Sequence, residues 1–436
     1  MTETMAAETT TAKVSLTFSG VAWFVVLLLI VSLGTMQPFV FVALQKLSPT
    51  DLIFPFALML WVGGLVFQRI RLRIDHSYWF LAAYFAAMAL SSIFSVNPAS
   101  SYIKLLGEVY LIGIAVLIFN QLTSDTRLKH AVFAWLAGTV ISLIVAAITI
   151  ALFYIQPDHW LLGYTTYHFG AVPVINFPRV SSTFVSASMF CDYLNVSVVL
   201  VFVAREKNWI GRKTLYGLVL AITLAALSTI SIGIGGVFLA IGAAIWLTKG
   251  KDAGKLPLAA LLAGIAFAVV FAVSSFVALK PHATAPYSWE IPIIGTVSPS
   301  PRTLVWTESL KTFAADPIFG KGLNQPVCAV PFQNTDGSYS MLTDAHNIYL
   351  SIAAQNGTFG LVSMLAICIF ILRLGFRSQD TSVRLLCVAF ATAFVYQGLT
   401  GAYEDARHLW ALIGVTIAAS KLGRGTEQSL THGTGV

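Results

Sequence analysis

Three residues in polar stretches of this sequence, Arg179, Arg302 and His346, are of types that bind an anion or move a proton. An arginine guanidinium is a planar set of donors that stays charged at any relevant pH and matches two phosphate oxygens at once. A neutral imidazole can take a proton from a hydroxyl as a general base. These residue types predict a site that binds a phosphate and activates a hydroxyl. The alternative for each is an ordinary residue at a membrane surface, with its charge in the headgroup region.

The segment SPRTLVWTESLKTFAADP, residues 300–317, predicts a short helix that begins at Pro301 and has Arg302 at the head of one face. Serine can cap this helix, proline suits its first position, and the Asp-Pro pair ends it. Trp306, Leu310 and Phe313 follow Arg302 at steps of four, four and three, which gives the helix an apolar face. We therefore expect the helix to lie on the membrane surface.

The segment TDAHNIYLSIAAQNGTFGL, residues 343–361, places His346 at the entry to a long apolar helix. Asp344 can cap this helix, which puts His346 in the first turn, where the helix dipole disfavours imidazolium. A nearby carboxylate favours imidazolium, so the sequence gives no net direction for the pKa of His346. Gly357 and Gly360 are expected to permit close helix packing.

The turn sequence GAYEDARHLW concentrates several charged side chains between two apolar segments. Glu404 or Asp405 in this turn is an alternative to Asp344 as the acid that orients His346. Arg407 would then extend the anion-binding surface. The competing interpretation is a solvated turn anchored by its aromatic residue.

The composition identifies the broad class of protein. The chain has 436 residues, of which 57% are hydrophobic and 10% charged. Soluble proteins have about 25% charged residues, so a soluble fold is excluded. Apolar runs such as residues 131–155 are continuous rather than alternating, which argues against an outer-membrane barrel. The net charge of +7 is scattered between apolar segments, so no nucleic acid partner is expected, and the four cysteines show neither zinc-site nor disulfide spacing.

The hydropathy pattern predicts an all-α, polytopic integral membrane protein with about 12 transmembrane helices. The predicted apolar segments are residues 21–36, 52–67, 78–96, 102–119, 131–155, 182–204, 215–229, 232–247, 257–279, 347–372, 383–399 and 409–419. The expected organisation is a cytoplasmic segment at 1–20, helices 1–9 within 21–279, a long outer loop with a short interfacial helix at 280–345, helices 10–12 within 346–422, and a disordered cytoplasmic tail at 423–436.

The basic residues predict how the chain is oriented in the membrane. With a cytoplasmic N-terminus, 18 of the 26 lysines and arginines fall on the inner side. Both termini are then cytoplasmic, and Arg179, the long loop and His346 face outward. Within the apolar segments, Lys104 and Glu108 are expected to form an ion pair, and Asp192 to hydrogen-bond between helices.

Three motifs make the chain resemble the O-antigen ligase and polymerase superfamily of bacterial inner-membrane glycosyltransferases. They are HNIYLSIAAQNGTFG, RTLVWTESLKTFAADPIFGKG and the looser RVSSTFVSASMF. The chain has Gln355 where many relatives have an acid, so that acid is not expected to be an obligatory catalyst here. It also has Ser182 where glycine is common, and Ala187 and Ser188 in place of a Pro-Asn pair. The turn YEDARHLW resembles that of the ligase-type members.

The resemblance implies transfer of a glycan from an undecaprenyl diphosphate carrier to a hydroxyl of lipid A core oligosaccharide or another glycan, at the periplasmic face of the inner membrane. Arg179 and Arg302 are expected to bind the diphosphate, and His346 to act as general base. Further substrate contacts are expected from four residues: Asn347, Trp306, Tyr349 and Arg407. No outward DxD motif or metal-ligand spacing is visible, so we expect an inverting, metal-independent glycosyltransferase without a cofactor.

Two other functions remain open at this point. A polysaccharide polymerase would use the same lipid-linked donor and join its repeats to another glycan. A lipid-linked sugar flippase or other transporter also accommodates about 12 helices. Transporters place polar residues near the membrane midplane and often have repeated halves, whereas the distinctive charges here lie at outer loop ends.

Overall fold

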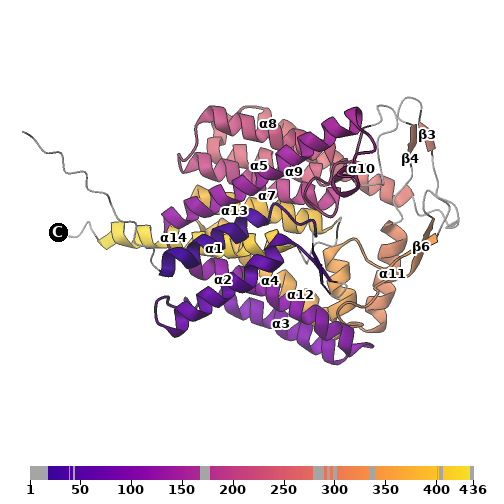
Figure 1. The fold of residues 1–436 in the computed structure, drawn as a ribbon, viewed down its shortest axis with the longest axis horizontal. Helices are drawn as coiled ribbons and strands as arrows, with labels where there is room; N and C mark the ends of the chain where they lie inside the picture. The colour runs from indigo at the N-terminus through magenta and orange to yellow at the C-terminus, as the bar shows by residue number, and fades with distance from the viewer. Residues whose placement is uncertain are drawn as a thin grey trace, which may run out of the picture.

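The structure is a bundle of long helices. A computed structural model describes residues 18–38, 40–42, 45–166, 177–277, 289–291, 295–297, 302–333, 339–399, 401 and 406–432. At one end of the bundle lies α11 (Arg302–Ala315), together with short hairpins, and from the opposite end projects the C-terminal part of α14 (Arg407–His432) (Figure 1).

Each predicted apolar segment overlaps a helix. In chain order these are α1 (Phe18–Ser32), α2 (Pro49–Val66), α3 (Ser77–Ile93), α4 (Pro98–Gln121), α5 (Asp125–Ile155), α7 (Ala187–Glu206), α8 (Arg212–Ser228), α9 (Ile234–Lys249), α10 (Leu256–Val277), α12 (Ile348–Arg377), α13 (Thr381–Phe390) with its π-helical continuation η3 (Ala391–Tyr396), and α14.

Short elements connect these helices. They are α6 (Leu162–Thr165), the 3-10 helix η2 (Gly250–Ala253), and the antiparallel pairs β1 (Val40–Val42) with β2 (Gln45–Leu47), β3 (Trp289–Ile291) with β4 (Gly295–Val297), and β5 (Val330–Gln333) with β6 (Tyr339–Leu342). The sequence analysis did not predict the hairpins. Each is only a few residues long and lies between helices, so it carries little hydropathy signal of its own.

Several helices suit a membrane interior. Five of those in the described residues are long and apolar enough to cross a bilayer: α2, α4, α5, α7 and α12. Shorter apolar helices are α1, α3, α9, residues 256–269 of α10, and α13 with η3. Large apolar side chains such as Phe56 and Ile369 are more than 60% exposed, as expected where a surface meets lipid. The structure fits a helical membrane protein, and the full number of crossings remains a prediction.

Helix α7 forms the centre of the bundle. In its most apolar stretch of 18 residues, 89% of the residues are buried, compared with 28–39% in the corresponding stretches of the other four long helices. Asp192 on α7 and His408 on α14 are fully buried, with 2.9 Å between Asp192 Oδ2 and His408 Nε2, which confirms the predicted hydrogen bond between helices. The predicted pair of Lys104 and Glu108 is also present, at 3.6 Å between Nζ and Oε1. Such partners reduce the cost of polar groups in an apolar interior.

Helix α12 is broken at Gly357, which has φ +65° and ψ −163°. The loop of residues 317–322 packs against this break. The Lys321 amide donates to the carbonyl of Ala354 at 2.9 Å. The Gly322 amide donates to the carbonyl of Gln355 at 3.0 Å. Gly357 therefore permits a kink in α12 against which the loop packs. The sequence had suggested only close helix packing at this glycine.

Gln355 strengthens the contact between this loop and the kink. Its Oε1 accepts a hydrogen bond from the Asn324 amide at 2.8 Å, and its Nε2 donates to Ser351 Oγ at 3.0 Å. The hydroxyl of Ser91 on α3 donates to the Gln355 carbonyl at 2.6 Å. The kink thus joins α3, α12 and the loop that follows α11.

The end of the chain differs from the sequence-based expectation. Helix α14 continues through residues 423–432, where a disordered tail was predicted. No proline occurs after residue 410, so nothing in the covalent structure prevents the backbone hydrogen bonds of the helix from continuing.

Replacing Gly357 with alanine tests the kink. A Cβ at this position would lie 2.1 Å from the Ile318 carbonyl oxygen, and alanine disfavours the positive φ by about 1–2 kcal/mol before any clash is counted. We expect Gly357→Ala to lower the thermal unfolding temperature in detergent by several degrees. The control is Gly217→Ala on α8, where a Cβ meets no atom within 4 Å and stability should be unchanged or slightly higher. Equal unfolding temperatures for the two variants would contradict a rigid kink.

Candidate active site

His346 lies at the junction between the long loop and α12, beside a carboxylate. Its Nδ1 is 3.3 Å from Asp344 Oδ2. The N-cap of α12 is Asn347, whose side chain accepts a hydrogen bond from the Leu350 amide at 3.1 Å, and the helix starts at Ile348. The prediction that Asp344 caps this helix and that His346 lies in its first turn is therefore wrong. Asn347 is adjacent to the helix and takes the cap, which leaves the Asp344 carboxylate to the imidazole.

The backbone and surroundings of His346 set its protonation. The residue has φ +48°, in the left-handed region that residues other than glycine rarely adopt, and 43% of its side chain is exposed. Burial of the rest lowers the pKa of His346, Asp344 raises it, and the nearby positive charge of Arg302 lowers it. The net shift is downward, so the neutral imidazole, the form that can accept a proton, predominates at neutral pH.

Helix α11 places Arg302 near His346. The helix starts at Arg302, one residue after the predicted start at Pro301, and its Val305 is fully buried in a small apolar cluster with Ala345 and Ala354. Ala345 precedes the histidine and Ala354 lies on α12, so the cluster ties α11 to both. Leu310, on the predicted apolar face, is 51% exposed, and the contact of this face with the membrane surface remains a prediction. Val305 and, one turn on, Ser309 face the protein.

Two predicted substrate contacts next to His346 bind the protein itself. Besides capping α12, Asn347 donates from Nδ2 to the Leu399 carbonyl at 3.2 Å. The Tyr349 hydroxyl lies 3.5 Å from the Val395 carbonyl of η3. Both residues thus hold the start of α12 against the end of the π-helical segment. Trp306, on α11, is half-buried, and its contact with substrate remains a prediction.

Arg179 lies where α8 ends and α7 begins. Its Nε donates to the Thr229 carbonyl at 3.0 Å, and its Nη2 is 3.4 Å from Ser188 Oγ at the start of α7. The hydroxyl of Ser188 in turn lies 3.2 Å from that of Ser231, just before α9. The guanidinium is therefore positioned where three helices end or begin.

A series of contacts connects the surroundings of Arg179 with those of His346. Ser231 Oγ accepts a hydrogen bond from the Gly233 amide at 3.3 Å, and a Cβ on Gly233 would lie 2.7 Å from the side-chain amide of Gln397. Two residues further along the chain is Leu399, whose carbonyl binds Asn347. Gly233 and Asn347, rather than Arg179 and His346 themselves, thus adjoin residues 397–399.

Ser182 accounts for one departure from the family pattern. It has φ +53°, a conformation that glycine adopts without cost. Its hydroxyl donates to the Ser142 carbonyl at 2.7 Å. This buried hydrogen bond offsets part of the backbone strain of a serine at a position where relatives commonly have glycine.

Arg407 forms a two-pronged ion pair away from the His346 contacts. Its Nε and Nη2 are each 2.8 Å from an oxygen of Asp51 on α2, and its Nε is 3.2 Å from the Tyr110 hydroxyl on α4. The guanidinium therefore ties α14 to α2 and α4. Its expected contribution to anion binding remains a prediction. The sequence analysis missed Asp51, which also completes a capping box at the start of α2, because 356 residues separate it from its partner.

The other two candidate acids, Glu404 and Asp405, lie outside the described residues. Asp344 is the candidate that the structure places beside His346. Among the residues that the structure describes, no three His, Cys, Asp or Glu side chains gather as a metal site requires.

These features define a helical membrane protein with a histidine, a carboxylate and an arginine gathered at one end of its bundle. Residues 215–365, about a third of the chain, match the family model described as O-antigen ligase. The match confirms the resemblance to the O-antigen ligase and polymerase superfamily, whose members are glycosyltransferase-like enzymes. It includes Arg302, Asp344 and His346, whereas Arg179 precedes it and Arg407 follows it. No match was found among curated proteins.

Opposite shifts in the pKa of His346 test this arrangement. Asp344→Asn removes the charge that stabilises imidazolium, so the pKa should fall further. Arg302→Gln removes a repulsive positive charge, so the pKa should rise. NMR titration of histidine-labelled protein in detergent measures both shifts, with the signal assigned through its loss in His346→Gln. Shifts in the same direction would contradict the observed placement of the three side chains.

Proposed function

We propose that this protein is an inverting, metal-independent glycosyltransferase that moves a glycan from undecaprenyl diphosphate to a hydroxyl of lipid A core oligosaccharide. The observation that carries the proposal is the grouping of Asp344, His346 and Arg302 inside the region that matches the O-antigen ligase family. The proposed location is the bacterial inner membrane, with the site facing the periplasm. The positive-inside distribution of lysine and arginine supports that orientation.

The proposed reaction needs one base and a positive environment for the leaving group. With Nδ1 of His346 directed at Asp344, the tautomer with a proton on Nδ1 is favoured, which leaves Nε2 to accept a proton. The acceptor hydroxyl oxygen attacks the anomeric carbon and gives its proton to Nε2. The bond from that carbon to the diphosphate oxygen breaks, its electron pair stays on undecaprenyl diphosphate, and one-step attack inverts the carbon.

Arginine side chains supply the positive environment in this mechanism. The positive charge of Arg302 lowers the pKa of His346, which supports a diphosphate bound by Arg302 near the base. We propose that Arg179, where α8 ends and α7 and α9 begin, binds the same diphosphate. Preorganised donors at a developing negative charge contribute about 2.7–4 kcal/mol each in comparable sites.

His346→Ala tests the base in a defined reaction. In proteoliposomes containing the purified protein, a lipid-linked glycan donor and a lipid A core acceptor, we expect transfer to fall at least about 100-fold. The matched control is His130→Ala, an exposed histidine near the start of α5, which should transfer at the unmodified rate. The stability of both variants is checked by thermal unfolding. Normal transfer by a folded His346→Ala variant would refute the role as base.

The products that accumulate without the protein distinguish a ligase from a polymerase. If the protein is the ligase, deleting its gene should leave full-length polymer on the lipid carrier and bare core on lipid A. Loss of a polymerase would instead leave single repeat units on the carrier or the core. Electrophoresis of lipopolysaccharide with mass spectrometry of the carrier-linked glycans separates these results. Single repeats would assign the chain to the polymerases.

A further inference from the structure

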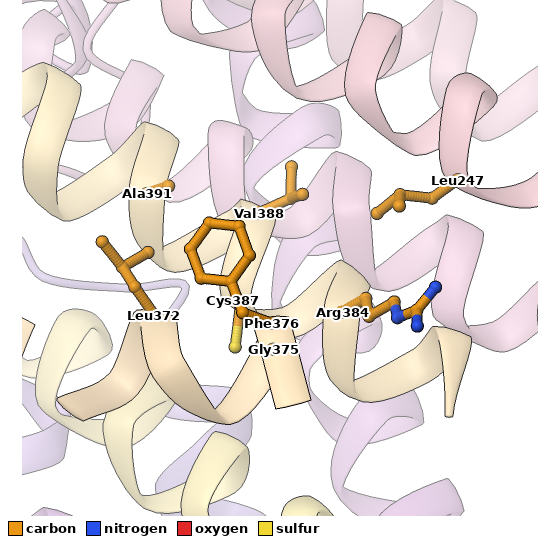
Figure 2. Close-up of a pocket in the computed structure, with 8 residues that line it drawn as sticks. All are labelled: Leu247, Leu372, Gly375, Phe376, Arg384, Cys387, Val388 and Ala391. Atoms are coloured by element: carbon orange, nitrogen blue, oxygen red, sulfur yellow. The ribbon is translucent and has the colours of Figure 1, made fainter. Parts of the chain in front are cut away.

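A pocket lies far from His346, between α9, α12 and the junction of α13 with η3. Its volume is about 310 Å³. It is lined by Leu247, Leu372, Gly375, Phe376, Arg384, Cys387, Val388 and Ala391 (Figure 2). Every lining residue except Arg384 is apolar, and none is acidic.

The pocket and the candidate active site lie at opposite ends of α12. Phe376 is 30 residues beyond His346, and a helix rises about 1.5 Å per residue, so the two are separated by roughly 40 Å along the helix. The diphosphate and glycan of a donor bound at His346 therefore do not occupy this pocket. By the distribution of lysine and arginine, the pocket end of α12 faces the cytoplasm.

Positive charge gathers around the mouth of the pocket. Arg384 lies at its edge, beside Leu247 and away from Leu372 (Figure 2). The last turns of the lining helices add Arg377 on α12 and Lys249 on α9, both exposed. The nearby acid Asp380 is paired with Lys207, at 3.1 Å between Oδ2 and Nζ. The mouth thus combines an apolar crevice with three basic side chains, while Asp252 of η2, the acid nearest to Lys249 in sequence, is not among the lining residues.

Arg384 is held in place but not saturated by its protein contacts. Its Nε donates to the Ser378 carbonyl at 2.7 Å, and its Nη2 lies 3.4 Å from Gln379 Oε1. A guanidinium has five N–H donors, so these two contacts leave capacity for a phosphate oxygen. The fixed Nε also lowers the entropy that a further contact would cost.

We propose that this pocket binds an anionic phospholipid, with one acyl chain in the apolar crevice and the headgroup phosphate against Arg384. Phe376, which is 87% exposed, then covers the chain. Lipid tails are as apolar as the crevice, so transfer from the bilayer gives little hydrophobic gain and the preference must come from charge. Basic pockets between transmembrane helices on the cytoplasmic side are suited to such headgroups.

Native mass spectrometry of the full-length protein in neutral detergent tests the proposal. Phosphatidylglycerol and phosphatidylcholine with identical acyl chains are added in equal amounts. We expect phosphatidylglycerol to be retained preferentially, and Arg384→Gln to reduce that preference about fivefold. Arg212→Gln, at an exposed arginine starting α8, should leave the preference unchanged. Equal retention of both lipids by the unmodified protein, or an unchanged preference in Arg384→Gln, would overturn the proposal.

A second variant distinguishes the crevice from a general attraction of anions to the surface. Ala391→Trp fills the crevice without removing charge, so it should lose the retained lipid while keeping its glycan-transfer rate. Glycerol phosphate, which has the headgroup chemistry but no chain, should not compete. Retention of lipid by Ala391→Trp, or full competition by glycerol phosphate, would show that the acyl chain does not occupy the pocket.

Discussion

The contact between residues 317–322 and the kink of α12 is the constraint on which the candidate site depends. Arg302 and His346 belong to different elements, and each could move independently if only the loop between them joined the two. Backbone hydrogen bonds to the carbonyls exposed by Gly357 hold the end of α11 to α12, while Val305 holds its start. Because two points fix the helix, the arginine is held close to the imidazole.

Two kinds of charged side chain can be distinguished in the described residues. Some form ion pairs that join helices, and others lie at the end of the bundle that carries His346. Asp192 with His408, and Arg407 with Asp51, join helices distant in sequence. Removing one partner from such a pair is costly in an apolar interior, so these pairs stabilise the packing of the bundle. His346 and Asp344 are each more than 40% exposed, so they can exchange water for substrate.

Sequence reasoning succeeds here where a signal is local and fails where it depends on distant partners. The start and end of α11 follow from a proline, an Asp-Pro pair and helical spacing, all within a few residues. The positions of the apolar helices follow from continuous hydropathy. The partner of Arg407 is 356 residues away, and the positive φ of His346 arises from its surroundings. The cap of α12 was mispredicted because Asp344 and Asn347 are both good capping residues, and only the backbone selects between them.

Gln355 shows how the structure changes the meaning of a departure from the family pattern. Its side-chain oxygen accepts a hydrogen bond from the Asn324 amide, which anchors the segment that follows α11. Its side-chain nitrogen donates to Ser351 Oγ. A carboxylate in the same place could accept from the same amide, and Ser351 could reverse its hydrogen bond to donate. An acid or an amide therefore satisfies this position equally in terms of hydrogen bonding. The requirement is an acceptor that fixes the loop, and the proton transfer proposed for His346 does not need a charge at residue 355.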